Sequence, residues 1–169
     1  MPYSSNYGKK IIIDWLSIQR KDIKDIVDFG AGAGYYGKLF KKFVPACYCI
    51  GVEIFEPYIE KYRLSAIYDE IYTDDASKMA LPNADIAVCG DVIEHMTKDV
   101  ATDFIKRIEA KYRHVIVSIP IGSYPQGASH GNEFESHLSE WSFDELCEIF
   151  KNFKIKLNYR IIAVFIKEL

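Results

Sequence analysis

The fold is decided by one stretch of the sequence, Ile26-Val27-Asp28-Phe29-Gly30-Ala31-Gly32-Ala33-Gly34-Tyr35-Tyr36-Gly37. A short apolar run ends at the carboxylate of Asp28, and glycines then alternate with alanines. In the segment that follows, Tyr36, Leu39 and Phe43 recur at helical spacing. This order predicts a strand, a glycine turn and a helix whose first N–H groups face a ligand. The acid near the strand end would repel a pyrophosphate, whereas it suits a ligand with a cationic end.

Outside this stretch, short apolar runs alternate with amphipathic segments. Further strands are expected over residues 48–53, 67–73, 85–89, 114–119, 153–159 and 161–167. Helices are expected over residues 9–20, after Pro57, over residues 100–112 and after Ser142, which forms a capping box with Glu145. The alternation predicts an α/β fold with a doubly wound, mostly parallel seven-stranded sheet that ends in an antiparallel C-terminal hairpin.

The composition is ordinary for a soluble globular domain. The 169 residues are 49% apolar and 27% charged, and the net charge of −3 gives no general attraction to nucleic acid. Every apolar run is far shorter than the roughly 18 residues that span a bilayer, and residues 1–5 do not resemble a signal peptide. We therefore expect one cytoplasmic domain over residues 1–169, with no membrane partner and with four reduced, buried cysteines.

In a doubly wound sheet, ligands bind at the carboxyl ends of the strands. Acids or glycines fall at four such ends: Asp28 and the glycines, Glu53, Asp75-Ala76, and Gly90-Asp91. A carboxylate such as Glu53 can accept hydrogen bonds from both hydroxyls of a ribose. One solvated acid at a strand end is common, but four in register predict a binding site.

The glycine stretch resembles the first motif of class I S-adenosylmethionine (SAM)-dependent methyltransferases, in which an acid precedes Gly-x-Gly-x-Gly. The resemblance covers residues 22–167 and implies that SAM is the cofactor and S-adenosylhomocysteine the product. It implies these cofactor-binding residues: Asp28, Gly30, Ala31, Gly32, Gly34, Glu53, Asp75, Ala76, Gly90 and Asp91. The glycines would lie under the methionine part, Glu53 would hold the ribose, and Asp75 with Ala76 would hold the adenine. Asp74 stands where relatives often carry glycine, so either adjacent acid could contact the adenine.

A dinucleotide site is the main rival. Residues 32–37 match Gly-x-Gly-x-x-Gly, and Glu53 follows at a suitable distance. In that fingerprint the first glycine directly follows the strand, which here runs into Gly30. Counting from Gly30 then puts Tyr35 where close helix–strand packing needs a small residue. The register therefore disfavours a dinucleotide-dependent oxidoreductase.

Two further segments carry candidate catalytic groups. Asp91-Val92-Ile93-Glu94-His95 follows the fourth strand, and the irregular stretch 120–141 carries His137. A loop of this length inside a domain is usually functional, and its aromatic and polar residues predict a lid that faces the substrate. Strands four and five are neighbours in this fold, so we expect His95 and His137 to converge in one cleft.

These segments resemble two groups of metal-assisted O-methyltransferases. The small-RNA 3′-terminal 2′-O-methyltransferases carry Glu-x-x-Glu-His and a later His-x-x-x-Trp, and the ubiquinone-pathway enzymes share the first motif only. The resemblance implies catalytic roles for Asp91, Glu94, His95 and His137, which could also coordinate Mg²⁺ or Mn²⁺. Aspartate replaces glutamate at position 91 and has a shorter reach. We expect no metal, and we expect the histidines to act as a base or as substrate ligands.

The expected function is methyl transfer from SAM to a hydroxyl on a small molecule or glycan. One alternative is an RNA 3′-terminal 2′-O-methyltransferase, although the acidic balance predicts only weak RNA binding. Another is a non-catalytic module that binds SAM or a partner. The intact strand-end acids and the polar loop favour an enzyme over such a module.

Overall fold

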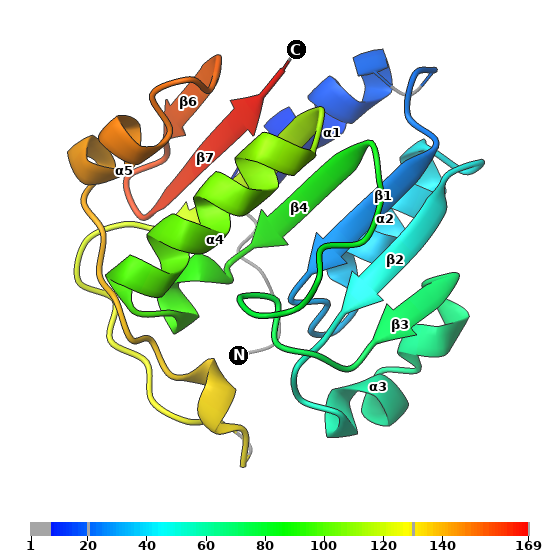
Figure 1. Ribbon diagram of the computed structural model, residues 1–169, viewed down its shortest axis with the longest axis horizontal. Helices are drawn as coiled ribbons and strands as arrows, with labels where there is room; N and C mark the ends of the chain where they lie inside the picture. The colour runs from blue at the N-terminus through cyan, green and yellow to red at the C-terminus, as the bar shows by residue number, and fades with distance from the viewer. Residues whose placement is uncertain (1–7, 20, 130, 169) are drawn as a thin grey trace.

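Seven strands form one sheet in the computed structural model, which describes residues 8–19, 21–129 and 131–168 (Figure 1). The strands are β1 (Asp25–Phe29), β2 (Tyr48–Val52), β3 (Glu70–Tyr72), β4 (Ile86–Gly90), β5 (His114–Pro120), β6 (Ile155–Asn158) and β7 (Ile162–Lys167). Their spatial order is β3-β2-β1-β4-β5-β7-β6. Strands β1 to β5 are parallel, and β7 pairs antiparallel with both β5 and β6. The predicted mostly parallel sheet with its C-terminal hairpin is confirmed.

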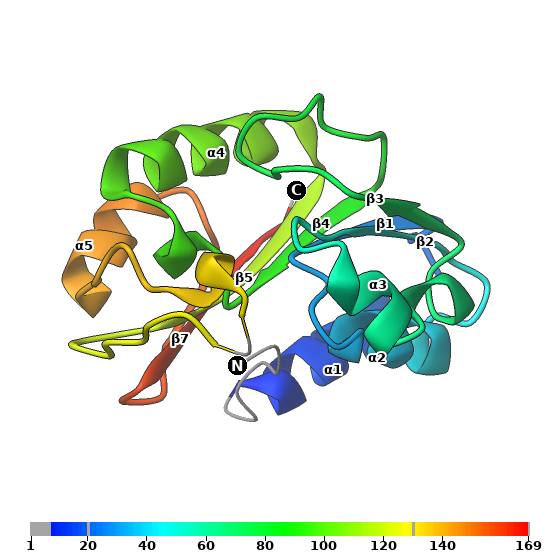
Figure 2. The ribbon, with the colours of Figure 1, turned by 90° about the horizontal axis from the view of Figure 1, so that it is seen from below.

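Helices cover both faces of the sheet (Figure 2). One face carries α1 (Lys9–Gln19), α2 (Tyr35–Phe43) and α3 (Pro57–Lys61), and the other carries α4 (Lys98–Lys111) and α5 (Phe143–Ile149). The described residues also form three short 3-10 helices: η1 (Leu64–Ala66), η2 (Ile93–His95) and η3 (Glu133–Glu135). Each face buries its own apolar cluster. Among the described residues, the helices are too short or too polar to cross a membrane.

The central strands explain why the sequence reads as continuous apolar runs. Every residue of β4 and β5 is buried, whereas the edge strands β3 and β6 are half-exposed. Parallel strands covered on both faces need apolar side chains on both faces, so they show no alternation. From β1 the sheet extends through β2 to β3, and from β4 it extends in the opposite direction to β5. This reversal opens a crevice at the carboxyl ends of β1 and β4.

The structure corrects some predicted boundaries. The strand expected over residues 67–73 is confined to Glu70–Tyr72, because the N–H groups of Ile67 and Tyr68 still bond to Leu64 O and close the turn of η1. The first helix ends at Gln19, and residue 20 of the predicted span lies outside the described residues. The capping box of Ser142 and Glu145 is confirmed.

The glycine turn rests on a buried carboxyl group. Asp28 of β1 is 1% exposed and accepts a hydrogen bond from the Tyr68 hydroxyl, which in turn accepts one from the Gly37 N–H at 3.2 Å. Burial raises the pKa of Asp28 to about 8; the Tyr68 hydrogen bond opposes this shift and the charge of Glu53 adds to it. Asp28 is therefore mostly protonated at neutral pH. Through Tyr68 it joins β1 to α2 and to the segment before β3.

This raised pKa predicts a pH-dependent loss of stability. The unfolded chain releases the Asp28 proton near the ordinary aspartate value of 3.8, whereas the folded protein keeps it until about pH 8. The folded state therefore binds more protons in this interval, and its stability falls as the pH rises through it. Asp28→Asn retains an acceptor oxygen without the ionisation. We expect its free energy of unfolding, relative to wild type, to increase from pH 5 to pH 8.

Urea unfolding at both pH values measures this difference. The matched control is Asp22→Asn, an exposed acid whose replacement should give the same small effect at both pH values. If Asp28→Asn and wild type keep a constant difference from pH 5 to pH 8, Asp28 does not retain its proton in the folded protein.

Candidate functional site

A cavity of about 370 Å³ opens at the carboxyl ends of β1 to β4. Its volume is in the range of sites for small molecules and cofactors. The wall includes these residues that the sequence predicts as cofactor-binding: Gly30, Ala31, Gly32, Glu53, Asp75, Ala76, Gly90 and Asp91. The rest of the wall includes residues from the start of α2, from the segment after β3, from η2 and the start of α4, and from the long loop between β5 and α5. The cavity thus lies where the doubly wound topology predicts a ligand.

Two predicted cofactor-binding residues are not in the cavity wall. Asp28 lies behind the glycine turn, where Tyr68 binds its carboxyl group. Gly34 immediately precedes α2, and its N–H donates to Ala31 O at 2.8 Å. Both residues therefore stabilise the glycine turn on the side that faces away from the cavity. The sequence pattern located the turn but could not distinguish its supporting residues from its exposed ones.

Two glycines allow the backbone itself to form the wall. Gly30 has a φ of 74°, and a Cβ atom there would lie 2.5 Å from Val92 Cγ2. A Cβ atom on Gly90 would lie 2.0 Å from Tyr36 Cε2, so the Tyr36 ring packs directly on the Gly90 backbone. Any larger residue at either position would have to displace a wall residue.

Glu53 is fixed by the backbone around it. Its Oε2 accepts a hydrogen bond from Gly32 N and its Oε1 accepts one from Phe55 N, both at 2.8 Å. The side chain is 5% exposed, and burial raises its pKa although these N–H groups oppose the shift. Each carboxylate oxygen retains further acceptor capacity. Glu53 can therefore accept hydrogen bonds from two adjacent hydroxyls of a ligand in the cavity.

Asp74 and Asp75 both line the cavity but have different partners. Asp75 accepts hydrogen bonds from Ser77 N at 3.0 Å and Ser77 Oγ at 2.6 Å, and it pairs with Lys78 at 2.8 Å. Burial tends to raise the pKa of Asp75, but the bonds to Lys78 and Ser77 outweigh burial and lower it. Asp74 accepts a hydrogen bond from Asp75 N at 2.7 Å. Asp75 thus stays ionised and can accept a hydrogen bond from an amino group.

Asp91 follows β4 in a strained backbone conformation. Its φ of 56° is in the left-handed region, which a residue with a side chain rarely adopts. The conformation is held because Asp91 N donates to Ser118 O of β5 at 2.8 Å. Strain of this kind concentrates at functional sites. Here it turns the chain from the end of β4 into η2, which carries Glu94 and His95.

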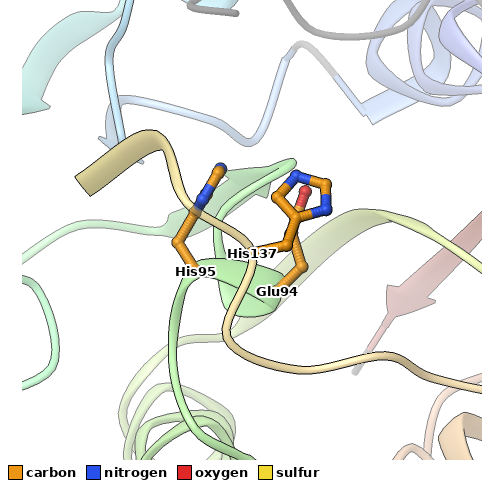
Figure 3. Close-up of side chains that lie close together, drawn as sticks. All are labelled: Glu94, His95 and His137. Carbon is orange, nitrogen blue, oxygen red and sulfur yellow. The ribbon is translucent and has the colours of Figure 1, made fainter. Parts of the chain in front are cut away.

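The predicted proximity of His95 and His137 is confirmed, but the two side chains line adjoining hollows and not the single cleft that was expected. Their ring centroids are 4.9 Å apart, although 42 positions in the sequence separate them. Glu94 joins them, and one potential ligand atom from each of the three side chains lies within 4.8 Å of the others (Figure 3). His95 lines the cavity itself, whereas His137 lines an adjoining hollow, and Leu138 lines both.

The hydrogen bonds of the two imidazoles define their tautomers. His95 Nδ1 lies 3.1 Å from Ser136 O, and His137 Nδ1 lies 2.7 Å from Tyr124 O. A carbonyl oxygen only accepts, so each Nδ1 carries the proton and each Nε2 keeps its lone pair. Burial lowers the pKa of both histidines, which favours the neutral form. The pair thus offers two proton-accepting nitrogens beside the cavity.

Glu94 is the most deeply buried group of this cluster. It is 1% exposed, and its Oε2 has no hydrogen-bond partner among the described residues. Burial raises the pKa of Glu94 well above the ordinary value, and the neighbouring charge of Asp91 raises it further. Burial therefore disfavours the ionised form of Glu94 unless a cation binds beside it.

Main-chain hydrogen bonds hold the loop that carries His137 against η2. Leu138 N and Ser139 N both donate to Glu94 O, at 2.8 and 3.1 Å. At the end of the loop, Gly122 N donates to Trp141 O at 2.8 Å, and Trp141 Nε1 donates to Ser139 Oγ at the same distance. His137 is therefore attached to the element that carries His95.

The sequence did not predict a contact between α3 and the part of the long loop that lines the cavity. The Tyr58 hydroxyl of α3 donates to Glu135 Oε1 of η3 at 3.1 Å, and both side chains are buried. Glu135 lines the cavity with its neighbour Phe134, so this part of the loop covers the site as predicted. The polar composition of the loop was a signal for the lid, but no local pattern pairs Glu135 with Tyr58.

Comparisons with a protein-family model and with solved structures agree with a cofactor site at the strand ends. The family model described as a methyltransferase domain matches residues 27–111, which is half of the chain and runs from β1 to the end of α4. No curated protein sequence matches this chain.

Solved structures share the fold at low sequence identity. A SAM-dependent methyltransferase from Clostridium acetobutylicum matches with a TM-score of 0.72 and 13% identity over 98% of this chain and 92% of that one. A mitomycin 7-O-methyltransferase matches with a TM-score of 0.65 and 14% identity, over 94% of this chain and 54% of that one. A small RNA methyltransferase matches with a TM-score of 0.68 and 18% identity, over 98% of this chain and 26% of that one. This chain thus spans about half the length of the mitomycin enzyme. With the glycine turn, the strand-end carboxylates and the family match in agreement, the chain belongs to the methyltransferase-domain family of class I SAM-dependent methyltransferases.

Proposed function

We propose that this protein transfers the methyl group of SAM to a hydroxyl on a small molecule or a glycan. The observation that supports this reaction most directly is the pair of imidazoles beside the cofactor cavity, whose Nε2 atoms keep their lone pairs. A hydroxyl must lose its proton when it attacks a methyl group, so a proton acceptor at this place fits O-methylation. The free thiols of the four cysteines fit a cytoplasmic enzyme.

The cavity offers complementary groups to each part of SAM. The backbone of Gly30 and Gly32 is open to the methionine part, and the carboxylate of Glu53 suits the two ribose hydroxyls. Asp75, with the backbone of Ala76, can receive the adenine amino group. The sulfonium methyl is already activated, so the protein mainly has to align the acceptor and exclude water. Phe134 and Leu138 in the wall favour such a dry environment.

Glu94, His95 and His137 also fit a divalent cation. Each Nδ1–H binds a carbonyl and each Nε2 keeps its lone pair, as in histidines that ligate metals. One carboxylate with two imidazoles suits Mn²⁺ better than Mg²⁺, and such a cation would lower the pKa of a bound hydroxyl. Asp91, the fourth predicted ligand, is outside this group. We propose a reaction without a metal, because burial disfavours the ionised form of Glu94, which is the form that binds a cation, and because the two imidazoles already supply proton acceptors.

The small RNA methyltransferase among the similar structures supports RNA as a second candidate substrate. The net charge of −3 argues against it, because RNA binding relies on contacts between cations and phosphates. A screen of methyl transfer from labelled SAM to phenols, quinols, sugar nucleotides and short RNAs decides between them. We expect transfer to a small hydroxyl compound. Transfer to RNA alone would contradict the proposal, and absence of SAM binding would contradict the function as a whole.

Glu53→Ala should lose affinity for SAM. Two charge-assisted hydrogen bonds to the ribose would disappear, each worth roughly 1.5 to 3 kcal/mol, so we expect a loss of at least about 100-fold. Titration calorimetry measures it, with Glu148→Ala on the exposed side of α5 as the control. Equal affinity of the two variants would show that Glu53 does not hold the ribose.

His95→Ala and His137→Ala should each lower kcat by roughly 100-fold or more, the usual contribution of a general base, while SAM affinity stays nearly unchanged. A chelator should leave wild-type activity intact. Activity that is lost to the chelator and restored by Mn²⁺ would contradict the metal-free reaction and assign Glu94, His95 and His137 to a cation. Unchanged kcat in both variants would exclude the histidines from the chemistry.

A further inference from the structure

Three large apolar side chains line the cavity and are nevertheless exposed. Val100 of α4 is 43% exposed, and Phe134 and Leu138 of the long loop are 52% and 60% exposed. A single apolar residue on a surface needs no explanation, but apolar residues that gather at one opening mark a binding site. Two separate segments supply these residues, so only the folded chain brings them to the same cavity. Together they form an apolar rim.

The apolar rim is adjacent to the imidazole pair. His95 lines the same cavity, and Leu138 directly follows His137 and lines both the cavity and the adjoining hollow. The segment with His137 passes beside η2, which carries His95 (Figure 3). The Tyr124 ring adds a further aromatic surface, with its centroid 5.9 Å from that of the His137 ring. A molecule that contacts the rim is therefore close to the two proton-accepting nitrogens.

The charges around the cavity disfavour an anionic acceptor. The acids in the wall are Glu53, Asp74, Asp75, Asp91 and Glu135. Among the described residues of the wall, Lys78 is the one lysine or arginine, and it pairs with Asp75 at 2.8 Å. The described residues of the adjoining hollow include Glu140 and neither lysine nor arginine. A phosphate or carboxylate on an acceptor would thus face several acids, and like charges across an interface are costly.

We propose that the methyl acceptor is an uncharged phenol whose ring packs on the apolar rim and whose hydroxyl points to the imidazole pair. An apolar ring gains by leaving water for these side chains, whereas sugar hydroxyls would lose their hydration against them. A phenol also releases its proton far more readily than a sugar hydroxyl, because its pKa is near the value of about 10 for tyrosine. This inference rests on the proposed function, because it takes methyl transfer from SAM as the reaction.

The step balances with SAM and the acceptor alone. The phenol oxygen attacks the methyl carbon, and the bond between carbon and sulfur breaks with its electron pair left on sulfur. The phenol proton moves to one of the two Nε2 atoms, which later releases it to water. The products are an aryl methyl ether and S-adenosylhomocysteine.

Three acceptors separate the effects of charge and polarity: 4-ethylphenol, 4-hydroxyphenylacetate and methyl glucoside. In 4-hydroxyphenylacetate a methylene insulates the carboxylate from the hydroxyl, so this compound differs from 4-ethylphenol mainly in charge. Methyl glucoside is uncharged but polar. Transfer of the labelled methyl group from SAM gives kcat/KM for each acceptor. We expect the value for 4-ethylphenol to exceed each of the others by roughly tenfold or more.

Substitutions in the rim test where the ring packs. Leu138→Ser and Phe134→Ser should each raise the KM for 4-ethylphenol by roughly tenfold, because they remove apolar contacts, while SAM affinity stays near the wild-type value. Leu138→Met keeps the contact and should behave like wild type. The matched control is Ile18→Ser, at a residue of α1 that is 77% exposed and lies outside the cavity wall. It should change neither quantity.

Several outcomes would overturn the proposal. A higher kcat/KM for 4-hydroxyphenylacetate or methyl glucoside than for 4-ethylphenol would do so, while transfer to a small hydroxyl compound or glycan would stand. Weaker SAM binding with an unchanged KM in Leu138→Ser and Phe134→Ser would assign the rim to the cofactor. SAM binding without transfer to any of the three acceptors would also contradict the proposal. If wild type binds no SAM, the proposed function itself fails.

Discussion

The hydrogen bond between Tyr68 and the buried carboxyl of Asp28 is the constraint on which the site depends. It fixes the end of β1 against the segment before β3, and the Gly37 N–H extends the connection into α2. The glycine turn is thereby held between three elements. Its other side is held by Gly30 N and Ala31 N, which both donate to Val52 O at 2.9 Å. The turn can thus stay open to a ligand without collapsing into the space that a cofactor needs.

Much of the fold follows from local patterns in the sequence. The apolar runs of β1, β4 and β5 are readable because both faces of these strands are buried, and the order of strands and helices then leaves few topologies. The meeting of His95 and His137 follows from the same topology, since the segments after β4 and β5 leave the same edge of neighbouring strands. These features depend on periodicity and connection rules, which a sequence carries directly.

Other features depend on partners far away in the sequence. Asp28 has the position of a ligand-binding acid, and only Tyr68, 40 residues later, shows that it is a buried support. Glu135 is one polar loop residue among several until Tyr58 is placed opposite it, 77 positions away. Such roles arise from tertiary packing, which local propensity does not contain.

Two hydrogen bonds between main-chain groups attach the long loop to Glu94. Leu138 and Ser139 donate through their N–H groups to the Glu94 carbonyl, so neither bond depends on the identity of the side chains involved. The part of the loop above the cavity is attached differently, through the side chains of Tyr58 and Glu135. Substitutions in that upper part can therefore reshape the entrance to the cavity without breaking the two main-chain bonds that hold the segment next to His137. The entrance to the cavity and the histidine pair of this protein can therefore evolve separately.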